Sequence, residues 1–170
     1  MEPLITLVIV TLILLALGAL GVRILHPWPV ALRGGLAAMF VLTGVAHFVG
    51  KRDDLIAMVP PFLPEPELLV TITGVLELAG AIGLLIPRTA PLAAGGLTLM
   101  LIAMFPANVH LALTGTDLGP MQELWPRTLL QVVFIAATIT AAVTSVRSRR
   151  VPTSAGVPAG VTDAGSRVGA

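Results

Sequence analysis

Five long apolar runs dominate the chain and restrict what it can fold into. They cover residues 4–22, 30–50, 68–86, 90–113 and 128–146, and the charged residues within them are Arg33 and Glu77. A helix of about 20 apolar residues is long enough to cross a hydrocarbon core of about 30 Å. Because lipid offers no hydrogen bonds to backbone N–H and C=O groups, each run must pair them internally. The runs therefore predict five transmembrane helices in an all-α protein.

The composition supports this class and excludes several others. Charged residues make up 11% of the 170 residues and hydrophobic residues 56%, whereas a soluble domain carries about a quarter charged residues. The net charge of +1 provides no basic stripe for nucleic acid. The chain has no cysteine and three histidines, so we expect no thiolate chemistry, no metal site and no covalently bound cofactor. The lipid bilayer is the first expected partner.

The runs also indicate how the chain is organised. We expect residues 1–29 to form an N-terminal transmembrane helix and loop, and residues 30–146 a four-helix membrane domain. Residues 147–170 are rich in Pro, Gly, Ala and Ser, which predicts a disordered cytoplasmic tail. The first run is an alternative candidate for a cleaved signal peptide. It lacks a basic segment before it and is long for a signal core, which favours a retained helix.

The positions of Lys and Arg predict the orientation. Lys51, Arg52 and Arg127 fall on one side of the predicted membrane. Six arginines fall on the other side: Arg23, Arg33, Arg88, Arg147, Arg149 and Arg150. Because the side richer in Lys and Arg is usually cytoplasmic, we expect a multi-pass plasma-membrane protein with its N-terminus outside and its C-terminus in the cytoplasm.

Glu77 is the most informative single residue. It lies nine residues into the third run, about 13.5 Å along the helix and close to the membrane midplane. An ionisable side chain at this depth usually faces the interior of a helix bundle. Its neighbours on the same helix face are all small, namely Thr73, Gly74, Gly80 and Ala81, which favours close contact with another helix. Two interpretations stay open: a carboxyl that relays protons or anchors a ligand, and a protonated carboxyl that only stabilises packing.

Five further polar residues lie near the ends of runs that should meet in the outer leaflet. They are His47, Asn108, His110, Arg127 and Gln131. With Glu77 beneath them, they predict a polar ligand-binding pocket that leads from the outer surface towards the midplane; no catalytic residue is assigned. Simpler explanations exist for each, such as an interfacial histidine, an asparagine that pairs backbone groups freed by Pro106, or interhelical hydrogen bonding by Gln131. The pairs Gly34-Gly35 and Gly95-Gly96 are expected to be points of close helix packing.

Several motifs together resemble the DoxX-like family of small integral membrane proteins. They are Gly44-Val45-Ala46-His47-Phe48, the Met58-Val59-Pro60-Pro61-Phe62-Leu63-Pro64 loop, residues 72–89 around Leu76-Glu77-Leu78, residues 105–110 with Asn108 and His110, and residues 125–131 from Trp125 to Gln131. The resemblance covers residues 33–146. It implies an all-α transmembrane four-helix bundle, to which the first run adds one N-terminal transmembrane helix.

The resemblance also suggests a function. Some DoxX-like proteins are associated with quinone-linked membrane redox complexes, in which they act beside a second subunit. It therefore implies a quinone-interacting subunit of a membrane redox complex, with a quinone as candidate cofactor and a redox subunit as candidate partner. The main alternative is a non-enzymatic membrane scaffold or assembly subunit. A haem held by His47 and His110 is a weaker alternative.

Overall fold

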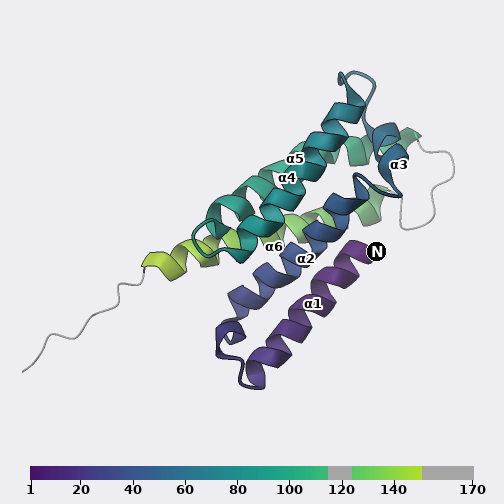
Figure 1. Ribbon diagram of the computed structural model, residues 1–170. Helices are drawn as coiled ribbons and strands as arrows, with labels where there is room; N and C mark the ends of the chain where they lie inside the picture. The colour runs from purple at the N-terminus through teal and green to yellow at the C-terminus, as the bar shows by residue number, and fades with distance from the viewer. Residues whose placement is uncertain (115–123, 151–170) are drawn as a thin grey trace, which may run out of the picture.

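The computed structural model describes residues 1–114 and 124–150, and these residues are entirely helical apart from turns and loops. The elements are α1 (Glu2–Ala19), the short 3₁₀ helix η1 (Arg23–Leu25), α2 (Trp28–Ala46), α3 (Arg52–Met58), α4 (Pro66–Leu85), α5 (Ala90–Thr114) and α6 (Leu124–Arg150). Five of them, α1, α2, α4, α5 and α6, are long and apolar enough to cross a membrane. They run alongside one another (Figure 1), so the predicted all-helical, membrane-spanning class is confirmed.

Prolines determine where several of these helices begin. Pro3, Pro29 and Pro66 lie in the first turns of α1, α2 and α4, where a missing backbone N–H costs nothing and the fixed φ angle already suits a helix. Pro106 is different because it lies inside α5, which continues past it to Thr114. A proline at this position removes one backbone donor from the helix.

Two predicted boundaries differ from the structure. The second run was expected to stay helical to Gly50, but α2 ends at Ala46 and the chain turns at His47. The tail was expected to begin at Arg147, but α6 continues to Arg150 because the last turn still follows the apolar helix without a proline or glycine. Residues 151–170 of the expected tail lie outside the described residues.

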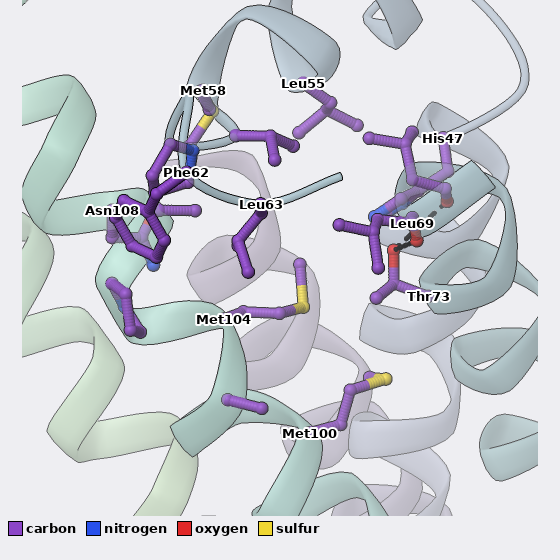
Figure 2. Close-up of a pocket in the computed structure, with 16 residues that line it drawn as sticks. His47, Leu55, Met58, Phe62, Leu63, Leu69, Thr73, Met100, Met104 and Asn108 are labelled. Carbon is purple, nitrogen blue, oxygen red and sulfur yellow. Dashed lines mark hydrogen bonds between the residues drawn. The ribbon is translucent and has the colours of Figure 1, made fainter. Parts of the chain in front are cut away.

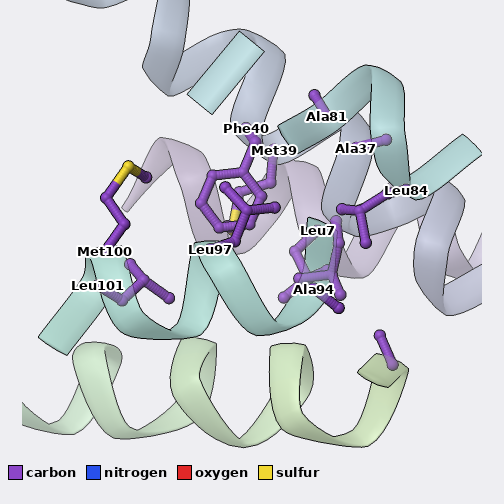
Figure 3. Packing of buried hydrophobic residues seen from close by; sticks show 12 residues of the cluster. Leu7, Ala37, Met39, Phe40, Ala81, Leu84, Ala94, Leu97, Met100 and Leu101 are labelled. Carbon is purple, nitrogen blue, oxygen red and sulfur yellow. The ribbon is translucent and has the colours of Figure 1, made fainter. Parts of the chain in front are cut away.

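The core lies between α2, α4, α5 and α6. Buried side chains from α2 and α5 interlock there, including Met39, Phe40 and Leu97 (Figure 3). Helix α2 contacts α1, α4 and α6, while α5 contacts α4 and α6. Helix α1 packs outside this group against α2, and Leu7 is its contribution to the buried core.

Glycines permit close contact between α2 and α4. A Cβ added at Gly44 would lie 2.9 Å from Leu78 Cδ2, and a Cβ added at Gly74 would lie 2.6 Å from His47 Cβ. The expectation of close packing at Gly95-Gly96 is wrong. An added Cβ at either of these two glycines would meet nothing within 4 Å, because this face of α5 points away from the neighbouring helices.

The bundle has two chemically different ends. At one end lie α3 and the loop before α4, and we call residues 47–65 the cap. The opposite end, which we call the basic end, consists of residues 20–27, residues 86–89 and the last turns of α6. In Figure 1 the cap lies at the upper right and the basic end at the lower left.

Candidate functional site

A cavity of about 350 Å³ lies beneath the cap, between α4 and α5. Most of its lining is apolar, and the side chains of Leu63 and Met104 point into it (Figure 2). The polar side chains on its wall are His47, Thr73 and Asn108. The apolar part comes from the cap (Leu55, Met58, Val59, Pro60, Phe62 and Leu63), from α4 (Leu69 and Val70) and from α5 (Met100, Ala103, Met104, Pro106 and Ala107). Such a lining is typical of small-molecule sites.

Arg52 holds the cap over this cavity. One guanidinium nitrogen donates to the carbonyl of His47 at 3.1 Å, which joins α3 to the end of α2. The other donates to Thr71 Oγ1 at 3.1 Å and to the carbonyl of Glu67 at 3.5 Å, both in α4. A single side chain therefore connects α3 to α4 and to the end of α2.

Glu77 lies in the contact between α2 and α4, as its small neighbours predicted. Its side chain is 4% exposed, and Thr43 Oγ1 lies 2.5 Å from Glu77 Oε2. Thr43 Oγ1 also lies 3.4 Å from the carbonyl of Phe40. A hydroxyl has one proton to donate and can also accept. Thr43 can therefore donate to the ionised carboxylate of Glu77, and it can accept from the carboxyl when Glu77 is neutral. The Glu77 side chain keeps this hydrogen bond in both protonation states.

His47 stands between Glu77 and the cavity. Its side chain is 3% exposed, and its Nδ1 lies 2.9 Å from the carbonyl of Thr43. A carbonyl only accepts, so Nδ1 carries a proton. The same nitrogen lies 3.9 Å from Glu77 Oε2. Nε2 is then the ring nitrogen left to bind a ligand, and Glu77 is close enough to stabilise a positively charged ring.

A second polar cluster joins α5 to α6. Arg127 Nη1 donates to Asn108 Oδ1 at 3.1 Å, and Asn108 Nδ2 donates to Gln131 Oε1 at 3.2 Å. Gln131 Nε2 in turn donates to the carbonyl of Leu101, five residues before Pro106. Gln131 therefore bonds both to Asn108 and to the backbone of α5. Asn108 is left facing the cavity (Figure 2).

Comparison with known proteins identifies the family of this chain. Residues 36–142 match a family described as Domain of unknown function (DUF8561). The chain belongs to this family. No curated protein and no solved structure matches it. The residues of the DUF8561 match include the whole cavity wall and both polar clusters but exclude α1. The DoxX-like resemblance stays a prediction.

The six predicted pocket residues of this DUF8561 protein occupy one end of the bundle but do not form one pocket. His47 and Asn108 line the cavity, while Glu77 lies behind His47, and Arg127 and Gln131 lie behind Asn108. His110 is half-buried farther along α5 and is not part of the cavity wall. The two histidines of the haem alternative therefore do not border the same cavity.

Several contributing residues were not identified from the sequence. Arg52 was counted only as a loop charge, and the hydrogen bond between Thr98 and Thr138, at 2.9 Å across α5 and α6, left no recognisable pattern. Thr43 gave a usable signal because it lies one turn before His47 on the same helix face. The apolar run from Leu55 to Leu63, which contains Pro60 and Pro61, was a further signal that could have indicated a segment covering an apolar surface.

Proposed function

We propose that this protein binds a quinone in the cavity beneath the cap, as the membrane subunit of a redox complex. The observation that carries the proposal is a largely apolar cavity with His47 on one side and Asn108 on the other (Figure 2). A quinone head group is a flat apolar ring with carbonyl oxygens at opposite ends. Two separated polar groups in an apolar cavity match that shape, since polar groups in such sites fix a ligand's orientation.

Both polar groups keep hydrogen-bonding capacity for a ligand. Asn108 Nδ2 carries two protons, and one of them bonds to Gln131. The second can be donated to a quinone carbonyl. With Nδ1 bonded to the carbonyl of Thr43, His47 Nε2 can accept the O–H of a quinol or, when protonated, donate to a quinone carbonyl.

Glu77 can help His47 accept a proton from a bound quinol. Oxidation of a quinol to a quinone releases two protons and two electrons. His47 can take up one proton at Nε2, and the carboxylate of Glu77, 3.9 Å from Nδ1, then stabilises the charged ring. The second proton passes to the aqueous phase, and both electrons pass to a redox centre on the proposed partner subunit, which acts as the oxidant.

The DoxX-like resemblance supports the same assignment and the expected partner. The distribution of Lys and Arg between the two ends predicts that the cap lies on the outer side of the plasma membrane. In this orientation the cavity lies at the depth of the outer leaflet, where a lipid-soluble quinone can reach it without crossing the bundle.

Binding measurements on the purified protein in detergent micelles test the proposal. Ubiquinone and menaquinone analogues are titrated against the wild type, His47→Gln and His26→Gln. Loss of one hydrogen bond to the ligand is worth about 1 kcal/mol or more, so His47→Gln should weaken binding about five- to tenfold. His26→Gln removes an exposed histidine at the basic end and should bind like the wild type. A folded wild-type protein that binds neither analogue at saturating concentration refutes the proposal.

A membrane scaffold is the second candidate, and the contact between Thr43 and Glu77 favours it. That contact joins α2 to α4 and stabilises the bundle without any ligand. Glu77→Gln separates the two functions, because an amide can still bond to Thr43 but cannot exchange a proton. A scaffold should keep its assembly and cellular phenotype in this variant. A quinone-linked subunit should still assemble but lose proton-coupled turnover in its complex.

A further inference from the structure

A second cavity, at the basic end, has a different character from the one beneath the cap. Its volume is about 300 Å³, and it is formed by the first turns of α2, the turn between α4 and α5, and the last turns of α6. Pro29, Arg33, Pro87, Ser145 and Ser148 are among the residues that line it. Three segments that are distant in the sequence therefore surround one cavity, and its wall includes one arginine and two serines.

Two residues on the wall of this cavity each contain a buried hydrogen-bond donor without a partner. In residues 1–114 and 124–150, three buried side-chain polar atoms lack a hydrogen-bond partner: Thr11 Oγ1, Arg33 Nε and Ser145 Oγ. Two of the three belong to residues of the cavity wall. Buried polar atoms nearly always have a hydrogen-bond partner. Two buried donors without one at the same site therefore indicate a site for a ligand.

Ser145 differs from the other hydroxyl-bearing residues of α6 in its hydrogen bonding. Hydroxyl groups elsewhere along α6 donate to the carbonyl four residues earlier, as Thr140 does to Ala136 at 2.7 Å and Ser148 does to Thr144 at 2.9 Å. The hydroxyl of Ser145 makes no such bond, although the residue is only 7% exposed. Its proton is therefore available to a group inside the cavity.

An acceptor with negative charge would satisfy both groups at once. Arg33 is a permanent cation with donors only, and Ser145 offers a second donor beside it. The acidic residues of the described part of the chain lie elsewhere: in the cap and the start of α4, at Glu77, and at Glu2 where α1 begins beside the cap. None of these carboxylates can reach the basic end to neutralise Arg33.

We propose that this cavity binds the phosphate of an anionic phospholipid in the leaflet at the basic end. Arg33 lies five residues into α2, about 7.5 Å from the start of the helix, and Ser145 lies five residues before the end of α6. Both therefore sit at the depth of lipid head groups. Basic cavities between transmembrane helices on the cytoplasmic side are suited to such head groups. The site is independent of the quinone cavity, which lies at the opposite end of the bundle.

The test uses the full chain, stripped of lipid in micelles of an uncharged detergent. Thermal stability is measured against phosphatidylglycerol, phosphatidylcholine with the same acyl chains, and inorganic phosphate. The variants are Arg33→Gln, Ser145→Ala and the matched control Arg23→Gln, which removes the same charge from the same end but outside the cavity. A ligand that binds only the folded state raises the melting temperature, and at a fixed ligand concentration the rise increases with the logarithm of the affinity.

The wild type should bind phosphatidylglycerol more tightly than phosphatidylcholine. Arg33→Gln should weaken that binding about tenfold, since it removes a charge-assisted hydrogen bond, and Arg23→Gln should weaken it less than about twofold. Ser145→Ala should weaken the binding of phosphatidylglycerol severalfold. If Arg33→Gln does not fold, the result for Ser145→Ala tests the proposal in its place. Equal losses in Arg33→Gln and Arg23→Gln, or no preference between the two lipids, overturn the proposal. Stabilisation by inorganic phosphate equal to that by phosphatidylglycerol overturns the assignment to a lipid.

Discussion

Replacement of Gly74 by alanine should separate α4 from α2 at the point where His47 borders the cavity. An ideal Cβ at this position would lie 2.6 Å from His47 Cβ, 3.0 Å from His47 Cγ and 2.9 Å from Phe48 Cε2. The exposed ring of Phe48 can swing away. His47 Cβ is fixed to the backbone, so relief at this contact requires one helix to shift against the other.

The magnitude follows from two opposing effects. Overpacking at a closely packed site costs typically about 1–3 kcal/mol, whereas Gly→Ala inside a helix stabilises it by about 1 kcal/mol. Gly96→Ala is the matched control, because its added Cβ would meet nothing within 4 Å and only the helix effect applies. The difference in free energy of unfolding between the two variants should therefore equal the packing cost alone, about 1–3 kcal/mol.

The assay is reversible unfolding in mixed micelles with increasing sodium dodecyl sulfate, followed by circular dichroism. Gly74→Ala should unfold at a lower detergent fraction than the wild type, and Gly96→Ala at an equal or higher one. The same displacement of His47 should weaken quinone binding. Equal stabilities for the two alanine variants would show that α2 and α4 are not in close contact at Gly74. The placement of His47 and Glu77 between these two helices would then be wrong.

Three further predictions concern other parts of the molecule. Thr138→Val should destabilise the protein by about 0.6 kcal/mol because it breaks an interhelical hydrogen bond, while Thr140→Val should not in the same unfolding assay. Arg52→Gln should speed amide hydrogen exchange in the cap about tenfold by releasing α3 from α4, with Lys51→Gln as the control. An extracytoplasmic phosphatase fused after Ala170 should be inactive in cells, and strong activity would reverse the predicted orientation.

The helices and the environment of Glu77 were predictable from the sequence because both depend on local patterns. The length of an apolar run decides whether a helix can span the membrane. The residues three and four positions from Glu77 decide which side of its helix is small enough to contact another. The structure places that carboxyl between α2 and α4, with Thr43 as its partner.

The details of the cavity depend on contacts between distant residues, and the sequence pattern does not contain them. The position of Asn108 relative to Gln131 depends on how α5 and α6 pack, which involves a separation of 23 residues. The cap was expected to be a proline-rich loop, yet α3 forms within it and Arg52 reaches back to α4. The structure divides these polar residues into two clusters, and the sequence pattern does not contain that division.

The two cavities differ in their relation to the DUF8561 match. Every residue of the cavity beneath the cap lies within residues 36–142. Arg33, Ser145 and Ser148 lie outside those residues, and Pro87 is the part of the basic cavity that lies inside them. The proposed quinone cavity therefore lies wholly inside the residues that match the family. The proposed phosphate site lies mostly outside them, in the first turns of α2 and the last turns of α6.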